Sequence, residues 1–254
     1  MSGIGIGVGL VVAGAGAGGA SGYSPLTKSL LLDGTDESVL FPDIAACNFT
    51  RTATATFAFW FKSTQAIAVY PFSRWEAAPG RGWIFSLTAT GALVFLFAGN
   101  NTAGDKIRNE TAGGYNDGAW HSVAAFLDGS NTLAGVTLYI DGAEATASQT
   151  GGIITGFPDS AAANVQAGYG NIPGVYYAGN ICHASVHTSD LSARVVELWG
   201  QGSPRSLTGT SCVFHSALGD GDAIGAGNVI DLISANNGTT QNCEAGDFVA
   251  DVPA

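Results

Sequence analysis

Three carboxylates near the C-terminus have the chemistry of a calcium site. Asp220, Asp222 and Asp231 lie close together in the sequence, and Asn228 lies between them. Calcium binds about six to eight oxygen ligands, which carboxylates and carbonyls supply. The spacing is not that of an EF-hand, and the alternative is a solvated acidic loop without a metal. We therefore predict calcium as the one cofactor to test, with these three aspartates as its ligands.

Three aromatic residues have the chemistry of a sugar site. Trp75, Tyr176 and Tyr177 lie in segments that we expect to be loops, and Asn171 is near the two tyrosines. An exposed aromatic ring can stack against a sugar, while an Asn or Asp side chain binds its hydroxyl groups. The alternative is that these rings belong to the core, as most aromatic residues of a β protein do. The pattern predicts a carbohydrate-binding site at Trp75, Tyr176 and Tyr177.

Catalytic patterns are absent from the sequence. Glycoside hydrolysis needs two carboxylates about 5–9.5 Å apart, but the acidic residues fall singly in expected turns. There is no GxSxG motif, and no histidine is linked to a serine or cysteine motif. His183 and His187 share one face of an expected strand, where they either bind a metal or are structural. We assign no catalytic residue and predict that the protein is not an enzyme.

Charge and cysteine content exclude further classes. The net charge is −11 and the nine basic residues are scattered, which argues against a nucleic-acid partner. The cysteines are Cys47, Cys182, Cys212 and Cys243, with no CxxC spacing, so structural zinc is not expected. We predict buried free thiols, and Cys212 with Cys243 is the pair to test for a disulfide.

The first 22 residues form an uncharged, glycine-rich segment. Its alternation places Ile4, Ile6, Val8 and Leu10 on one face of a β ribbon. It has no basic region of the kind that opens a signal peptide, and its glycines disfavour a membrane-spanning helix. A ribbon of this kind cannot form a core alone. We predict an assembly arm that neighbouring chains order; a flexible leader and a membrane contact are the alternatives.

The rest of the chain reads as short strands between turns, which indicates a sandwich or a barrel. Alternation is clearest in TATFAFWFK, where Phe57, Phe59 and Phe61 fall on one face. A single short helix is expected after Ser192, with Val195 and Leu198 on its apolar face. The expected strands are 29–33, 54–62, 83–88, 92–97, 120–127, 136–140, 164–168 and 180–186.

Two segments identify a family resemblance. DGAWHSVA at 117–124 and VTLYIDG at 136–142 resemble the paired strands of the laminin-G-like, concanavalin A-like jelly roll. The aromatic strand at 57–61 is similar to that of the same family. The resemblance implies an all-β fold in which two antiparallel sheets form a jelly-roll sandwich, with an extended N-terminal arm and one short helix. Many relatives bind calcium at a rim of loops, so it also implies the calcium site above.

The C-terminal segment resembles the segment that usually opens such domains. The glycine-rich N-terminal segment, the laminin-G-like region and the C-terminal segment together resemble virion proteins of tailed bacteriophages. This implies a structural, non-enzymatic virion protein: a capsid decoration, fibre or tail component that forms homo-oligomers and contacts other virion proteins. The alternative is a carbohydrate-binding lectin module that uses calcium. We divide the chain into an arm (1–22), a laminin-G-like jelly roll (23–203) and a segment that closes or packs on the same sandwich (204–254).

Overall fold

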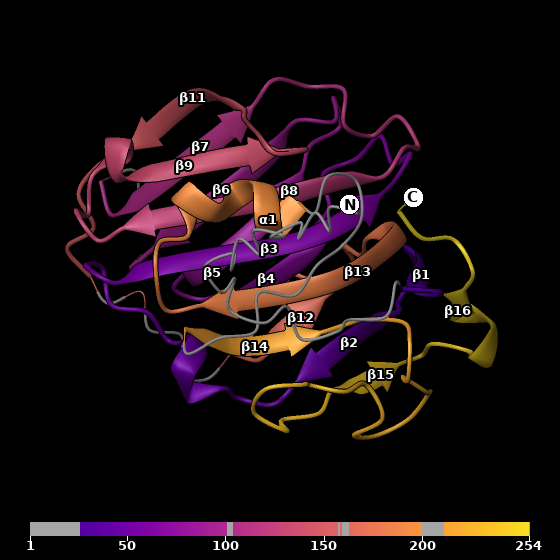
Figure 1. The fold of residues 1–254 in the computed structure, drawn as a ribbon. Coiled ribbons are helices and arrows are strands. Elements are labelled where there is room, and N and C mark those ends of the chain that lie inside the picture. Colours follow the sequence, from indigo (N-terminus) through magenta and orange to yellow (C-terminus); the bar gives the residue numbers. More distant parts are fainter. Residues whose placement is uncertain (1–25, 101–103, 157, 159–162, 200–210, 254) are drawn as a thin grey trace, which may run out of the picture.

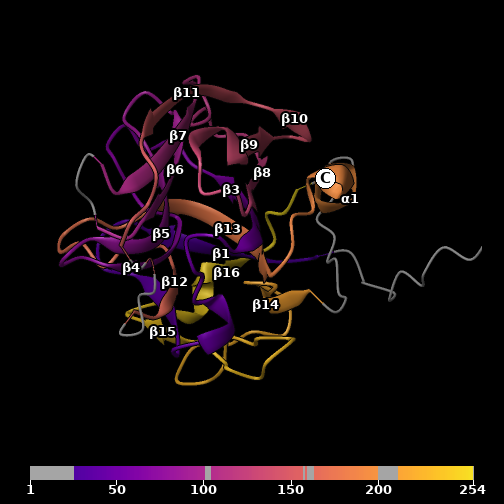
Figure 2. The same ribbon diagram turned by 90° about the vertical axis from the view of Figure 1, so that its left-hand side faces the viewer.

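Two antiparallel β-sheets packed face to face make up the molecule (Figures 1 and 2). The structure is a computed structural model that describes residues 26–100, 104–156, 158, 163–199 and 211–253. Strands dominate, and one short α-helix lies outside the sheets. The prediction of an all-β jelly-roll sandwich with one short helix is confirmed.

The strand order of both sheets follows from the backbone pairing. Sheet A runs β10 (Ala143–Glu144), β9 (Val136–Ile140), β8 (His121–Asp128), β3 (Thr54–Lys62), β13 (Ala178–His187), β1 (Ser29–Asp33) and β16 (Phe248–Val249), and β14 (Cys212–Ser216) also pairs with β13. Sheet B runs β11 (Thr146–Gly151), β7 (Lys106–Thr111), β6 (Leu93–Ala98), β5 (Arg81–Leu87), β4 (Phe72–Glu76), β12 (Val165–Ala167), β2 (Ser38–Phe41) and β15 (Thr239–Gln241).

The core between the sheets is mainly aromatic. Phe57, Phe59 and Phe61 point inward from β3, as the alternation predicts, and all are buried. Phe59 meets Phe85 of sheet B edge to face, with ring centroids 5.0 Å apart. Burying one such side chain contributes about 1.5–3 kcal/mol, so this layer holds the sheets together.

The outer face of sheet A is covered by the short helix α1 (Val195–Trp199). Leu191 and Leu198 pack with Ala58 and Ala124, which are small enough for a close approach. A 3₁₀ turn, η3 (Ser192–Arg194), precedes the helix. The Asp190 carboxylate accepts a hydrogen bond from the Ser192 amide at 2.8 Å. The sequence places Ser192 as the N-cap of the helix, whereas in the structure Ser192 is the first residue of the 3₁₀ turn and Leu191 is its N-cap.

The C-terminal segment adds β14 and β16 to sheet A and β15 to sheet B. β15 pairs with β2 in sheet B, while β16 pairs with β1 in sheet A. The remaining short turns are η1 (Ala45–Cys47), η2 (Leu133–Gly135) and η5 (Ala245–Asp247). The chain's last described residues thus lie against its first described strands.

All four cysteines are buried free thiols, as predicted, and Cys212 and Cys243 do not form a disulfide. Burial raises the pKa of the Cys212 thiol to about 12 and that of Cys243 to about 11. These thiols are therefore protonated and unreactive at neutral pH. Within the described ranges, no helix is long and apolar enough to cross a membrane.

Candidate ligand-binding rim

Three loops meet at one end of the sandwich, and we call residues 63–71, 112–120 and 168–177 the loop rim. The strand register brings them together. Phe61 near the end of β3 pairs with His121 at the start of β8. Lys62 pairs with Asn180 near the start of β13. The loops that follow β3 and precede β8 and β13 must therefore share this end.

An open hollow of about 360 Å³ lies beside the loop rim, over the ends of β1, β3 and β13. Small-molecule pockets have volumes of about 300–1,000 Å³, so the hollow is large enough for a small ligand. Leu31 is 38% exposed and supplies an apolar surface. The residues that line the hollow are Leu31, Leu32, Lys62, Ser63, Thr64, Gly118, Ala178, Gly179 and Asn180.

One glycine makes the hollow possible. Gly179 has φ +138°, and a Cβ there would lie 2.1 Å from the Lys62 carbonyl oxygen. Only glycine permits both this dihedral angle and this close approach. Beside it, the Lys62 ammonium group pairs with the Asp251 carboxylate at 2.7 Å. Burial alone would raise the pKa of Asp251, but its bonds from Lys62 and Trp120 outweigh that effect and lower it.

Three partly exposed tyrosines, Tyr70, Tyr169 and Tyr176, lie together on the loop rim, and we call them the tyrosine cluster. The rings of Tyr169 and Tyr176 are stacked, with centroids 4.8 Å apart and planes 15° apart. Tyr70 lies over Gly170, where a Cβ would come within 2.6 Å of the Tyr70 ring. Burial raises the pKa of Tyr70 and, together with nearby Tyr176, that of Tyr169. The cluster presents aromatic surface and hydroxyl groups at one place.

Of the three aromatic residues predicted to contact sugar, only Tyr176 lies partly at the surface. Trp75 is 3% exposed and packs against Ile84 and Ala98 on the outer side of sheet B. Tyr177 is fully buried, and its hydroxyl donates to the carbonyl groups of Lys62 and Asn180. Trp75 and Tyr177 are thus part of the packed structure. Tyr177 points inward while Tyr176 points outward, because adjacent residues of an extended chain point to opposite sides.

The two predicted segments nevertheless lie side by side. The Asn171 side chain donates to the Trp75 carbonyl oxygen at 3.3 Å, while the Ser73 hydroxyl donates to the Tyr169 carbonyl oxygen at 2.8 Å. Residues 73–76 belong to strand β4, not to a loop as expected. The reason is long-range: Arg74 is buried and pairs with Asp43 at 2.5 Å, a contact that local sequence does not reveal.

His121 fastens the loop rim to sheet A. Its Nδ1 lies 2.8 Å from the Asp141 carboxylate, and its Nε2 lies 3.1 Å from Asp117. Burial opposes the protonation of His121, but the two carboxylates outweigh it and raise the pKa. A histidine held between two turns in this way positions loops, which is the structural role that its place in the sequence motif indicates.

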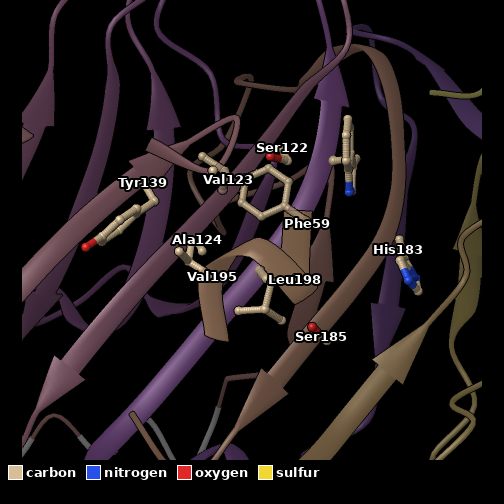
Figure 3. A pocket seen from close by; sticks show the side chains of 12 residues that line it. Phe59, Ser122, Val123, Ala124, Tyr139, His183, Ser185, Val195 and Leu198 are labelled. Carbon is tan, nitrogen blue, oxygen red and sulfur yellow. The ribbon is translucent and has the colours of Figure 1, made fainter. Parts of the chain in front are cut away.

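A second pocket, which we call the crevice, lies beneath α1 on the outer face of sheet A (Figure 3). Its volume leaves room for about one water molecule. Val195 and Leu198 of α1 close it from above. A sugar ring is larger than this space. The other lining residues include Ala58, Trp60, Ser122, Ala124, Tyr139, His183 and Ser185.

The histidines on β13 are part of the protein interior. His183 Nδ1 lies 2.9 Å from His215 Nε2, and His187 Nε2 lies 3.3 Å from the Ser185 hydroxyl. Burial, with a smaller contribution from His215, holds the pKa of His183 well below its usual value. In the part of the chain that the structure describes, no group of three or more His, Cys, Asp or Glu residues could hold a metal.

The three aspartates predicted to bind calcium hold loops in place. Asp220 accepts hydrogen bonds from the amide and hydroxyl groups of Thr27, at 2.5 and 2.6 Å. Asp222 accepts from the amides of Gly219 and Ile230, both at 2.8 Å. Asp231 accepts from the amides of His215 and Ile233 and from the Ser234 hydroxyl. The structure thus does not bring these three carboxylates together as a metal site; each accepts hydrogen bonds from backbone or side-chain donors around it.

Sequence reasoning did not single out the residues of the hollow. Lys62 ends a strand that was predicted and Ser63 follows it, but nothing in the sequence marks them as a site. The hollow arises where three strand ends meet, and it depends on pairings between residues that are far apart, such as Lys62 with Asn180. The only local signal is Gly179 at the start of a predicted strand, which marks a close backbone approach.

Solved structures share this fold at low sequence identity. A putative carbohydrate binding protein from Bacteroides ovatus aligns with a TM-score of 0.58 and 14% identity, over 89% of this chain and 62% of its own length. The sialidase CBM40 of Ruminococcus gnavus, bound to α2,3-sialyllactose, aligns with a TM-score of 0.50 and 14% identity, over 70% of this chain and 98% of its own. No curated protein matches the sequence.

Residues 33–197 match the family described as the concanavalin A-like lectin/glucanases superfamily. The matched region includes most strands of both sheets and all three loops of the rim. The chain therefore belongs to the concanavalin A-like lectin/glucanase superfamily.

Proposed function

We propose that this protein is a non-enzymatic carbohydrate-binding protein that holds its ligand at the loop rim. The observation that carries the proposal is the open hollow at the loop rim, where polar groups surround the apolar side chain of Leu31. Small-molecule sites combine apolar surface with a few converging polar groups. Leu31 supplies the former, and Lys62, Ser63 and Thr64 supply the latter. The carbohydrate-binding proteins that share the fold support the same function.

The experiment is a glycan array probed with the full-length protein, with and without calcium. We expect binding that does not need calcium. In the double variant Tyr169→Ala/Tyr176→Ala, binding should weaken at least about tenfold, since a central aromatic contact contributes more than about 1 kcal/mol. Tyr139→Ala is the matched control, because Tyr139 is a partly buried tyrosine at the crevice. If the full-length protein binds no glycan, the proposal is wrong.

The virion hypothesis stays a prediction. It depends on the arm at residues 1–22, with Ile4, Ile6, Val8 and Leu10 on one face, and this segment lies outside the described residues. An assembly arm and a glycan-binding rim are compatible in one chain. The test is to compare the oligomeric mass of the full-length protein with that of the chain lacking residues 1–22. An unchanged mass would contradict the arm's role in assembly.

A further inference from the structure

The one charged side chain of the hollow is paired with a residue near the C-terminus. Of the described residues that line the hollow, Lys62 alone is charged. Its ammonium group pairs with the Asp251 carboxylate, with Nζ 2.7 Å from Oδ2. Within the described ranges this is the one hydrogen bond that the Lys62 side chain makes. Because an ammonium group has three donors, Lys62 is balanced in charge and can still donate to a ligand.

Several contacts hold Asp251 in place. Its Oδ1 accepts a hydrogen bond from Trp120 Nε1 at 2.9 Å. Its backbone carbonyl oxygen accepts one from the Ser29 hydroxyl at 2.5 Å. The next residue, Val252, packs against an apolar cluster that includes Trp60. The carboxylate is therefore fixed beside the ammonium group by the fold, and the ion pair is more than a chance contact between two mobile side chains.

A further negative charge lies near the hollow. Asp33 on β1 pairs with the lining residue Ala178 on β13. Strand alternation places the Asp33 side chain on the same face as Leu31, and it is exposed. Carboxylate and sulfate groups are bound by Arg or by unpaired Lys. Since Asp251 neutralises Lys62, an acidic ligand in the hollow would find no free cation and would lie near the Asp33 carboxylate.

We propose that Asp251 is the specificity-determining residue of the hollow: it pairs with Lys62 and thereby restricts the hollow to uncharged glycans. Lys62 then serves as a hydrogen-bond donor to sugar hydroxyl groups, beside the exposed Thr64 at the edge. An acidic glycan must either displace Asp251 from its partners or leave its own charge unpaired, and both weaken binding. This inference rests on the proposed function and adds the charge class of the ligand and the residue that sets it.

The first experiment compares uncharged glycans with acidic derivatives of the same core, such as lactose with α2,3-sialyllactose, on the full-length protein. We expect the uncharged members to bind at least about tenfold more tightly, since like charges at an interface are strongly unfavourable. This gap should narrow at high salt, because salt screens exposed charges. Equal binding of the two classes would overturn the charge inference while carbohydrate binding stands. If no glycan of either class binds, the proposed function itself fails.

The variant Asp251→Asn removes the ion pair and little else. The asparagine Oδ1 can still accept from Trp120, and the backbone carbonyl can still accept from Ser29, so this segment should stay in place. The Lys62 ammonium group then becomes an unpaired positive charge that can bind a carboxylate. We expect α2,3-sialyllactose to bind about five- to tenfold more tightly than it binds the wild-type chain, while binding of lactose changes by less than about twofold.

Two control variants show whether this gain depends on Lys62. The double variant Asp251→Asn/Lys62→Gln should lose the gain, because no ammonium group remains at the hollow. Glu197→Gln also frees a cation, since Glu197 pairs with Arg194 at 2.6 Å, but neither residue lines the hollow. It should leave the binding of both glycans unchanged. Thermal unfolding of each variant checks that the fold is intact.

Three results would overturn the role of Asp251. The first is a folded Asp251→Asn variant that binds α2,3-sialyllactose no better than the wild-type chain does. The second is a gain that persists when Lys62 is replaced as well. The third is an equal gain in Glu197→Gln, which would show a general effect of net charge. The comparison of the two glycan classes on the wild-type chain tests the charge inference independently of all these variants.

Discussion

The hollow at the loop rim and the crevice beneath α1 are lined by similar kinds of residue, yet they differ in every physical property that matters for binding. Both are lined by hydroxyl groups and aliphatic side chains. The hollow is open and wide, and Lys62 keeps donors available there. The crevice has room for about one water molecule, and the side chains of Val195 and Leu198 from α1 close it. Residue type alone therefore does not identify a site; space and uncommitted polar groups do.

Histidines in the two regions show the same contrast. His121 at the loop rim has two carboxylate partners that raise its pKa. The histidines behind the crevice are buried, and burial is the main reason why the pKa of His187 and that of His215 fall to about 4. The loop rim favours a charged imidazole, whereas the interior of sheet A excludes one.

The largest expected effect is acid destabilisation through these buried histidines. Their folded pKa of about 4 lies below the unfolded value of about 6.5. The unfolded state thus binds more protons between these values, and the free energy of unfolding falls as the pH falls from about 6.5 to about 4. Each histidine contributes on the order of 3 kcal/mol to this loss. Urea unfolding measured across this range checks it.

The control for that experiment is the His187→Leu variant, which removes one of the buried histidines. Its unfolding free energy should fall less steeply over the same pH range. An equal slope in both proteins would mean that carboxylates, not buried histidines, cause the acid sensitivity.

Filling the two spaces should have opposite consequences. Ala124→Leu forces extra volume into the crevice, and we expect a loss of about 1–3 kcal/mol of unfolding free energy with glycan binding retained. Thr64→Leu adds similar volume at the open hollow and should change stability by less than about 0.5 kcal/mol, while it weakens binding. Thermal unfolding and glycan binding, measured on both variants, distinguish the two regions. A stable Ala124→Leu variant would show that the crevice is more open than described.

Replacing His121 beside the loop rim should change the free energy of unfolding by a smaller amount, and this change should be larger at low pH than at high pH. The raised pKa of His121 means that its stabilisation is fully present below about pH 6.5 and is lost as the pH rises through the folded value. We expect His121→Gln to cost about 1 kcal/mol at pH 6 and less at pH 8. A cost that is equal at both pH values would contradict a charged His121.

The smallest expected effect is that of calcium. Asp220, Asp222 and Asp231 already accept bonds from loop amides or hydroxyls, so millimolar calcium should leave the melting temperature unchanged. Differential scanning calorimetry with calcium and with EDTA measures this. A saturable rise in melting temperature would restore the calcium site predicted from the sequence.

Strands with strict alternation could be predicted to the residue. TATFAFWFK begins and ends where β3 does, because local periodicity and flanking turns decide it. β4 was mistaken for a loop, since its pairing with β12 and the ion pair of its buried Arg74 with Asp43 join residues that are far apart in sequence. β7 alternates Ile107, Asn109 and Thr111 inward and went unnoticed, because charged residues separate them.

The candidate site was predictable only in part. Sequence reasoning predicted Tyr176 as part of a sugar site but could not tell which of Tyr176 and Tyr177 points inward. Alternation says only that the two side chains point to opposite sides, not which of them faces the core. The hollow depends on the register of β1, β3 and β13, and no motif encodes a register. Calcium was expected from acidic residues whose oxygens accept hydrogen bonds from neighbouring amides and hydroxyls, one of them from Thr27 far away in sequence.

The pairing of β15 with β2 and of β16 with β1 has a consequence for biosynthesis. β1 and β2 find these partners only after all the strands between them have been synthesised. Until then their open edges are exposed to other nascent chains, a setting that favours misassembly. Deletion of residues 239–249 would therefore leave both edges bare.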